Sequence, residues 1–233
     1  MGKIAAIGGG RYSDGEITSF AGIIRSLSYA EKPKMLFLPT AGRDNIDGDE
    51  YMLDAFKDSG CETDILFLTD ETLSDEYIKS AILGADIIYA GGGDLVFLMT
   101  TLKKTKADVY LKQAYEKGTV MSGYSSGSMC WFDSGYDDCG EDHSFVFADC
   151  LGILPFCNCP HFESEHWQTF IEAIKTRDQN GVAADDGAML IYNEGEFSFA
   201  RGNDGGDVYF FDKNDSHKMT KISDNPNILK KYF

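Results

Sequence analysis

The sequence predicts an α/β fold in which a mostly parallel β-sheet lies between layers of helices, with a small antiparallel extension near the C-terminus. Short apolar runs alternate with helix-like segments through the first two thirds of the 233 residues. Strands that are apolar on both faces are typical of a parallel sheet covered by helices. The last third changes to a pattern typical of β-hairpins. Because no linker or internal repeat interrupts the chain, we expect a single domain over residues 1–233.

The expected elements follow from the order of these segments along the chain. Apolar runs predict buried strands at residues 3–8, 34–41, 63–68, 86–93 and 119–125. The segments that predict helices are residues 15–27, 49–60, 75–83, 108–118 and 163–176. Ser74 is a favourable N-cap for one of these helices, and Gly60 ends another. Two segments predict β-hairpin strands, 182–200 and 207–212.

The charge of the chain limits its partners. The net charge is −17, and no basic patch suited to a phosphate backbone is visible, so a nucleic acid partner is not expected. Anionic substrates would be repelled unless a local basic group offset this charge. No apolar run is long enough to span a bilayer, and the N-terminus lacks the apolar core of a signal peptide. We therefore expect a cytoplasmic protein without a membrane partner.

The six cysteines are expected to be thiols in a reducing compartment. Cys157 and Cys159 are two residues apart, but no second matched pair accompanies them. Closed zinc sites usually contain two such pairs, so neither a metal nor another cofactor is predicted.

The segment Gly123-Tyr124-Ser125-Ser126-Gly127 has the pattern G-x-S-x-G, at the end of one predicted strand and before residues that can begin a helix. In this context the motif predicts a sharp turn that lifts one hydroxyl above the sheet edge. Ser125 is therefore the candidate nucleophile. The backbone N–H of Ser126, at the start of the helix, is the first candidate oxyanion donor.

A nucleophilic serine needs a base, and His161 has the most suitable context. It follows an apolar run and Pro160, which places it on a loop, where catalytic residues are frequent. His143, His166 and His217 lie in acidic, helical and polar surroundings that favour a structural or surface position.

The base needs an orienting carboxylate, and the reaction needs a second oxyanion donor. An acidic segment between Ser125 and His161 contains Asp133, Asp137, Asp138, Glu141 and Asp142. The glycine turn of "YAGGGD" (89–94) ends a strand expected near the one that carries Ser125, so its N–H groups can point into the same crevice. The similar "IGGGR" (7–11) matches no phosphate-binding spacing.

Four motifs in order, "YAGGGD", "GYSSGS", "LGILPFCNCPHF" and "AADDGAML", resemble the peptidase E and cyanophycinase group of serine peptidases. The resemblance implies a fold similar to class I glutamine amidotransferases, which is flavodoxin-like. It also implies Ser125 as nucleophile, His161 as base, and an acid after the nucleophile helix, with Asp138 first and Glu141 in reserve. Gly92 and Ser126 would supply the oxyanion N–H groups.

One departure concerns substrate choice. Dipeptidases of this group hold an aspartate at the cleaved bond with basic residues, whereas no arginine lies between His161 and Arg177 here. Aspartyl specificity is therefore in doubt.

The sequence thus predicts a serine peptidase, dipeptidase-like, that cleaves a small peptide or isopeptide through an acyl-enzyme. One alternative is an esterase of the α/β-hydrolase type that uses Ser125, Asp185 or Asp186, and His217, an order that such enzymes allow. Another is a non-catalytic protein of the same fold that binds a small molecule or peptide. The oligomeric state is left open, with a homodimer as one option.

Overall fold

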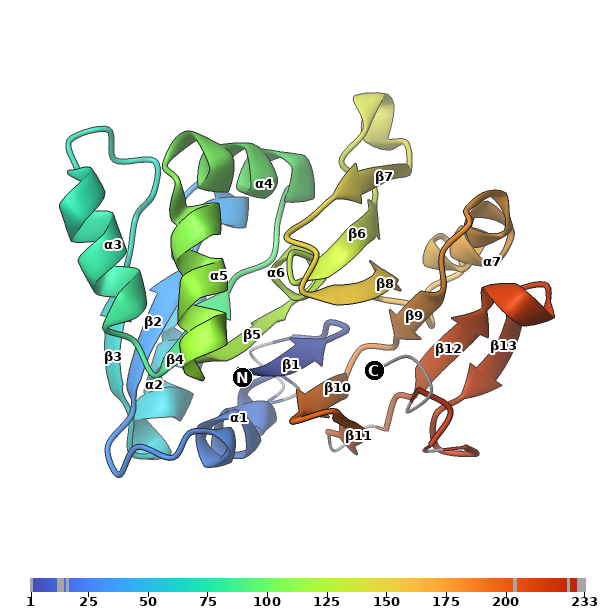
Figure 1. Ribbon diagram of the computed structural model, residues 1–233, viewed down its shortest axis with the longest axis horizontal. Coiled ribbons are helices and arrows are strands. Elements are labelled where there is room, and N and C mark those ends of the chain that lie inside the picture. The colour runs from blue at the N-terminus through green and yellow to red at the C-terminus, as the bar shows by residue number, and fades with distance from the viewer. Residues whose placement is uncertain (1, 12–14, 16, 203–204, 226, 230–233) are drawn as a thin grey trace.

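Two β-sheets form the framework of the protein, as the computed structural model in Figure 1 shows. The structure describes residues 2–11, 15, 17–202, 205–225 and 227–229. The first sheet has seven strands, in the spatial order β11 (Glu196–Arg201), β10 (Ala188–Asn193), β1 (Lys3–Ile7), β5 (Val120–Tyr124), β4 (Ile87–Ala90), β2 (Lys34–Leu38) and β3 (Glu62–Ile65). The five strands from β1 to β3 are parallel, whereas β10 and β11 are antiparallel additions at one edge.

The second sheet is mixed. Its six strands, in spatial order, are β13 (Lys218–Lys221), β12 (Val208–Asp212), β9 (Gly181–Ala184), β8 (Leu154–Cys159), β6 (Phe132–Asp137) and β7 (Val146–Asp149). The three central strands β6, β8 and β9 are parallel, and the outer strands pair with them antiparallel. The carboxyl ends of β8 and β9 therefore meet at one edge of this sheet.

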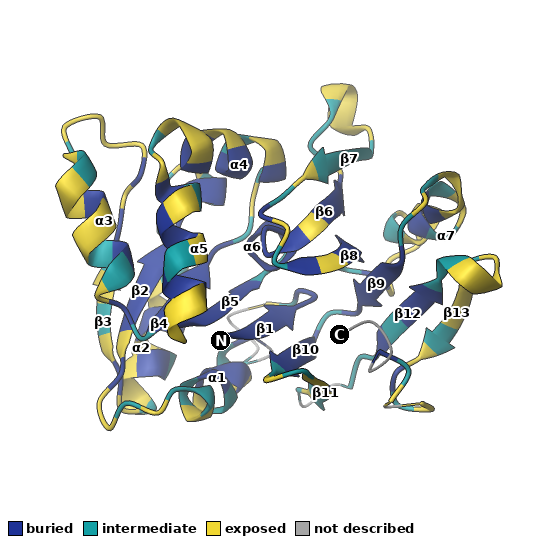
Figure 2. Cartoon of the chain, in the orientation of Figure 1, coloured by how far each residue is buried: buried dark blue, intermediate teal, exposed yellow. Residues whose placement is uncertain are grey.

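Helices cover both faces of the first sheet. One face packs against α3 (Asp75–Leu83), α4 (Leu95–Lys104) and α5 (Ala107–Lys117), and the other against α1 (Ala21–Leu27) and α2 (Glu50–Asp58). The strands alternate accordingly, since Ile4 of β1 belongs to the first core and Ala5 to the second. Figure 2 shows the result, with buried central strands, a partly exposed edge strand β3, and helices that are exposed on their outer sides. Among the described residues, no helix is long and apolar enough to cross a membrane.

The remaining helical segments are short. They are α6 (Ser126–Met129), α7 (Phe170–Ala173) and six 3₁₀ turns, η1 (Thr18–Phe20), η2 (Thr40–Gly42), η3 (Glu141–His143), η4 (Trp167–Thr169), η5 (Ile174–Thr176) and η6 (Lys213–Asp215). The helix α7 packs on the outer face of the second sheet, where Phe170 is buried with Phe211 of β12. The inner face of that sheet shares its core with the first sheet.

The α/β fold class is confirmed, and so are the five predicted strands of the parallel sheet. The Ser74 hydroxyl accepts the Tyr77 N–H at 3.1 Å, as expected of an N-cap. Gly60 follows α2 with a φ of 89°, in the left-handed region that favours glycine. The helix expected over 15–27 begins at Ala21, after the turn η1, and its residue 16 lies outside the described residues.

Three local features go beyond the expectations. Within the segment 182–200, β10 and β11 form an antiparallel hairpin as predicted, but β9 joins the second sheet while β10 lies in the first. The segment 163–176 is not a continuous helix but η4, α7 and η5 in succession. The acidic segment expected to supply the orienting carboxylate begins with a buried strand, β6. The second sheet is therefore larger than a small antiparallel extension.

Candidate active site

Ser125 lies at a sharp turn between β5 and α6. Its backbone has φ 53° and ψ −127°, which is an uncommon and costly conformation for a residue other than glycine. The turn is tight on both sides. A Cβ on Gly123 would lie 2.5 Å from the Gly127 carbonyl oxygen, and a Cβ on Gly127 would overlap the Ala90 carbonyl oxygen. Only glycine fits at these two positions, so the predicted strand–turn–helix context of the motif is present.

The turn aims the Ser125 hydroxyl at His161. The distance from the Ser125 Oγ to Nε2 of His161 is 2.9 Å. On the other side of the ring, Nδ1 of His161 lies 2.6 Å from Oδ1 of Asp186. A carboxylate oxygen can only accept, so this contact places the ring proton on Nδ1 and leaves Nε2 to accept the serine proton. The three side chains therefore form one continuous chain of hydrogen bonds.

The sheets explain why residues so far apart in sequence meet here. His161 follows β8 and Asp186 follows β9, and these two strands are parallel neighbours. Ser125 follows β5, whose parallel neighbour β1 leads to Gly9. Gly9 forms a bridge with Asp186, and the Gly187 N–H donates to the Gly9 carbonyl at 3.0 Å. The loop after β1 thus joins the end of the first sheet to the loop that carries Asp186.

Gly9 also needs to be glycine. A Cβ at this position would overlap both Oδ1 of Asp186 and the ring of His161. The backbone of "IGGGR" therefore packs directly against the histidine–carboxylate pair, a function that its spacing did not indicate.

Two further side chains border the pair. The Oε2 of Glu163 accepts the backbone N–H of Asp186 at 2.7 Å, which fixes the loop. Burial raises the pKa of the Glu163 carboxyl above its ordinary value. The Trp167 ring lies against the His161 ring, with 5.2 Å between the ring centroids. Sequence analysis had selected neither residue.

The carboxylates expected to orient His161 do not contact it. Among the described residues, the hydrogen bonds and the ion pair of the His161 ring involve Ser125 and Asp186, not Asp138 or Glu141. Asp138 is exposed at the end of β6, and Glu141 lies in the exposed turn η3. Asp186 stands in the "AADDGAML" motif and had been considered only with a different histidine.

Asp137, the neighbour of Asp138, is buried, with 1% of its surface exposed. Its carboxylate accepts the Leu95 N–H at 3.1 Å and the Asp138 N–H at 3.0 Å, and lies 3.4 Å from the Ser126 Oγ. Burial raises the pKa of Asp137 to about 6. This carboxyl therefore lies beneath the turn that carries the nucleophile.

The two predicted oxyanion donors lie beside Ser125. Ser126 is the first residue of α6, so its backbone N–H has no acceptor within the helix. Its hydroxyl donates to the Gly93 carbonyl at 2.6 Å, which ties the elbow to the turn after β4. In that turn, a Cβ on Gly92 would lie 3.2 Å from the Ser125 Cβ. The backbone of Gly92 thus approaches the nucleophile closely.

The other histidines lie elsewhere. The Nε2 of His217 lies 3.0 Å from the Gln179 carbonyl oxygen, and His143 and His166 are exposed. Asp185 accepts the Asp207 N–H at 2.9 Å and the Tyr209 hydroxyl at 3.1 Å rather than binding a histidine. The arrangement that an α/β-hydrolase esterase would require is therefore not formed.

An open pocket of about 460 Å³ contains the hydrogen-bonded chain. Its lining residues are Gly93, Ser125, Asp137, Asp138, His161, Glu163, Ser164, Trp167 and Asp186. A larger pocket of about 600 Å³ lies between α4 and the loop before α3, but its described lining includes no serine, cysteine or histidine. The smaller pocket is therefore the candidate active site.

The sequence matches the family described as Peptidase family S51 over residues 4–200, which is most of the chain and includes every residue of this pocket. The chain belongs to peptidase family S51. This family membership confirms the predicted resemblance to peptidase E and makes the protein a serine-type peptidase. The residues of the site lie on the carboxyl ends of strands that this match covers.

Two proteins named as peptidases are similar to this chain in sequence. A Bacillus subtilis (strain 168) protein named uncharacterized peptidase YgaJ is 31% identical over 214 residues, which cover 90% of this chain and 91% of that protein. Uncharacterized peptidase Lin0382 of Listeria innocua is 26% identical over 98 residues, 40% of this chain and 47% of that protein.

Solved structures share the fold. A peptidase from an acI-B1 actinobacterium superposes with a TM-score of 0.71 at 17% identity, covering 94% of both chains. A putative peptidase E protein from Listeria monocytogenes EGD-e gives a TM-score of 0.66 at 18% identity, covering 86% of this chain and 98% of that one. At these identities the likeness supports the fold and not the substrate.

Proposed function

We propose that this serine peptidase is a dipeptidase-like enzyme that hydrolyses a small peptide or isopeptide through an acyl-enzyme, with Ser125 as nucleophile and His161 as base. The observation that carries the proposal is the chain of hydrogen bonds from Ser125 through His161 to Asp186 at a strained elbow. The pocket volume of about 460 Å³ falls within the usual range for small-ligand sites, which supports a small substrate.

The mechanism begins when the Ser125 Oγ attacks the amide carbonyl carbon. Nε2 of His161 accepts the hydroxyl proton, and the Asp186 carboxylate stabilises the imidazolium that forms. The oxygen of the tetrahedral intermediate becomes an anion, and the backbone N–H groups of Ser126 and Gly92 are the proposed donors to it. His161 then gives its proton to the leaving amine, and the C–N bond breaks. A water molecule, deprotonated by His161, hydrolyses the resulting ester and restores Ser125.

In this proposal Asp186 is the orienting acid, the function that the sequence had suggested for Asp138. Its carboxylate oxygen at 2.6 Å from Nδ1 has the geometry needed to hold the imidazole in one tautomer and orientation. Asp138 and Glu141 are then outside the proton path, so the proposal assigns neither of them an orienting function.

The test is turnover of a panel of dipeptides and β-linked isopeptides by the purified protein and three variants. Ser125→Ala and His161→Ala should each lower kcat by about 10⁴- to 10⁶-fold, as in other serine peptidases. His217→Ala is the matched control, because this histidine binds the Gln179 carbonyl away from the pocket, and it should keep nearly full activity. Full activity of Ser125→Ala would contradict the mechanism. Tight peptide binding without turnover would favour the alternative of a non-catalytic binding protein.

A further inference from the structure

The lining of the active-site pocket is strongly acidic. Four of its nine lining residues are carboxylic acids, Asp137, Asp138, Glu163 and Asp186, and none of the described lining residues is lysine or arginine. Any substrate whose carbonyl reaches the Ser125 hydroxyl must enter this field. The net charge of −17 on the whole chain also attracts cations over a longer range, so it favours positively charged substrates too.

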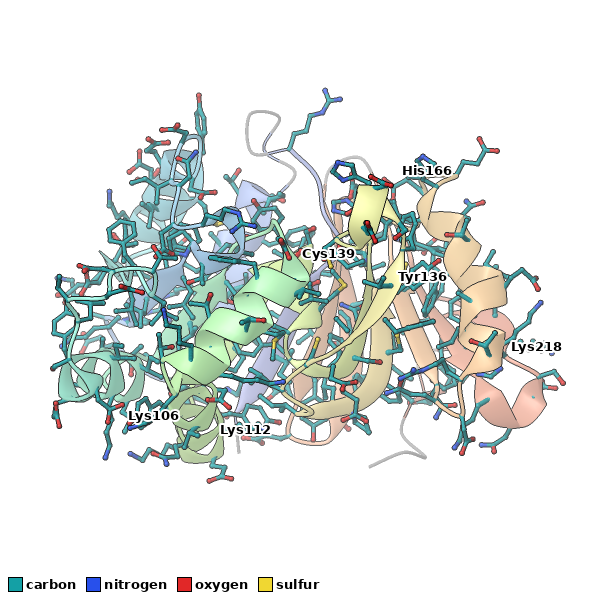
Figure 3. All side chains as sticks on the ribbon, turned by 90° about the horizontal axis from the view of Figure 1, so that it is seen from above. Lys106, Lys112, Tyr136, Cys139, His166 and Lys218 are labelled. Atoms are coloured by element: carbon teal, nitrogen blue, oxygen red, sulfur yellow. The ribbon has the colours of Figure 1, made fainter. Side chains whose placement is uncertain are left out.

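Neither Arg43 nor Arg11 adds a positive charge to the pocket lining. Arg43 pairs with Asp94 at 3.3 Å, and its guanidinium lies over the Phe97 ring, 4.1 Å from the centroid. Arg11 follows the "IGGG" turn and does not belong to the pocket lining. In Figure 3, the labelled Lys106 and Lys112 lie at the lower left, whereas His166, which precedes Trp167 of the pocket, lies at the upper right.

Two of the four carboxylates are already committed inside the protein. Asp186 binds His161, and Asp137 accepts backbone N–H groups from Leu95 and Asp138. Glu163 uses one oxygen for the Asp186 N–H. By contrast, the Asp138 carboxylate is exposed, and within the described part of the chain it forms no hydrogen bond or ion pair. Among the four pocket carboxylates, Asp138 is therefore the one with neither oxygen engaged by the described residues, and it is exposed to an incoming ligand.

An aromatic face completes the pocket. Trp167 lines it and is only partly buried, packed against His161 on one side and edge-to-face against Phe145, with 5.0 Å between the ring centroids. A tryptophan face beside carboxylates is a combination that attracts organic cations, through the ring quadrupole and through charge. This feature is independent of the acidic residues and favours the same class of ligand.

We infer that the enzyme selects substrates with a positively charged group next to the scissile bond, held by Asp138 and the Trp167 face. The inference rests on the proposed function and specifies its substrate class. Lysine and arginine side chains carry such a group. An aspartate at the same place would meet the exposed Asp138 carboxylate, in a pocket whose described lining includes no lysine or arginine.

The experiment compares dipeptides that differ only in charge. Each contains lysine, arginine, norleucine, glutamine or aspartate on one side of the amide and leucine on the other, in both orders, with free and acetylated amino termini. We expect kcat/KM for lysine or arginine to exceed that for norleucine by at least about tenfold, which is 1.4 kcal/mol, and the advantage to shrink as salt is added. Acetylation removes the terminal amine from the lysine and norleucine peptides alike, so an advantage due to the side-chain cation should persist in the acetylated peptides. Loss of the advantage on acetylation would count against recognition of the side chain.

A pair of variants tests Asp138 itself. Asp138→Asn should raise KM for the cationic peptides and lower their advantage over norleucine about five- to tenfold, with little change in kcat for the neutral peptide. The matched control is Asp142→Asn, which removes the same charge from the same exposed segment but does not line the pocket. It should leave the preference unchanged.

The outcomes separate the inference from the proposed function. Hydrolysis of norleucine or aspartate peptides as fast as cationic ones, or an unchanged preference in Asp138→Asn, would overturn the inference and leave the peptidase mechanism intact. If no peptide is hydrolysed, the proposed function fails instead. Calorimetric binding of the same peptides to Ser125→Ala protein then tests the inference, and equal affinity for lysine and norleucine peptides would overturn it.

Discussion

The carboxylate of Asp186 lies 2.6 Å from Nδ1 of His161, and the two residues are held there by neighbouring parallel strands. Because β8 and β9 run in the same direction, the loops that follow them leave the sheet at the same edge. His161 is on the first loop and Asp186 on the second. The position of the acid is thus a consequence of strand order in the second sheet and not of closeness in sequence to Ser125.

This relationship predicts that Asp186 and not Asp138 supports catalysis. Asp186→Asn keeps the shape of the side chain but removes the acceptor that fixes the imidazole tautomer, so kcat should fall by about 10³- to 10⁴-fold. Asp138→Asn should leave kcat for a neutral peptide nearly unchanged. Steady-state kinetics on both variants, with circular dichroism to verify folding, makes the measurement. A large loss of kcat in Asp138→Asn together with a small loss in Asp186→Asn would reverse the assignment.

The close approach of Gly9 gives a prediction about a residue with no reactive group. Gly9→Ala places a Cβ where Oδ1 of Asp186 and the His161 ring now lie, so the pair must separate. We expect kcat to fall by at least about 10²-fold, since small misplacements of catalytic groups have effects of this size.

Gly22→Ala is the matched control for this substitution. Gly22 is exposed in α1, where a new Cβ would have only one contact, at 3.9 Å from the Ser59 Oγ. Alanine is the better helix former, so this variant should retain activity and gain about 0.5 kcal/mol of unfolding free energy. Equal activity of the Gly9→Ala and Gly22→Ala proteins would show that the loop after β1 does not position the pair.

The buried thiols predict the response to cysteine reagents. Burial raises the pKa of Cys157 to about 12 and that of Cys139 to about 11, and raises the pKa values of Cys130 and Cys159 well above the ordinary value. Few thiolates are then present at pH 8, and the thiolate is the reactive form. Ellman's reagent should react slowly with the native protein and with all six thiols in denaturant. Treatment of the native protein with iodoacetamide should leave peptidase activity intact. Rapid loss of activity under this treatment would contradict a serine mechanism.

The sequence was sufficient for the parallel sheet, because its strands are continuous apolar runs bounded by glycine turns or helix caps. It was also sufficient to predict that Ser125 and His161 belong to one site, since a glycine-flanked elbow and a histidine after a buried run are both local patterns. Their contact at 2.9 Å agrees with that expectation. Their catalytic functions stay predictions until the variants are measured.

The acid could not be found in the same way, because its position depends on pairing between distant strands. Asp138 was suggested by the resemblance and by its place between Ser125 and His161 in the sequence. In the structure it follows directly after the strand β6, is exposed, and forms no hydrogen bond with the His161 ring. The hairpin pattern of 182–200 is real for β10 and β11, but it gave no indication that β9 belongs to the other sheet and that Asp186 stands where the chain passes between the two sheets. The glycines of "IGGGR" gave no indication, because what they approach is supplied by residues about 150 positions later.

The buried carboxyl of Asp137 predicts a specific dependence of stability on pH. Its pKa rises from 3.8 to about 6 in the folded protein, mainly because burial disfavours the charged form. The groups that face it are the Leu95 and Asp138 N–H groups, the Ser126 hydroxyl, and the side chains of Asp138 and Cys139. The folded state therefore binds a proton that the unfolded chain has already released at pH 5.

The sign follows from this difference in bound protons. Below pH 4 the group is protonated in both states and has no effect, whereas between about pH 4 and 6 the free energy of unfolding falls as pH rises. Above pH 6 the ionised Asp137 carboxylate lowers the free energy of unfolding by its full amount, roughly 3 kcal/mol from the two pKa values. Asp137→Asn cannot ionise, so its urea unfolding curves should lack this part of the fall from pH 4 to pH 7. Asp142→Asn, an exposed control, should follow the wild type. If the free energy of unfolding changed with pH in the same way in the wild type and in Asp137→Asn, Asp137 would ionise as freely in the folded protein as in the unfolded chain.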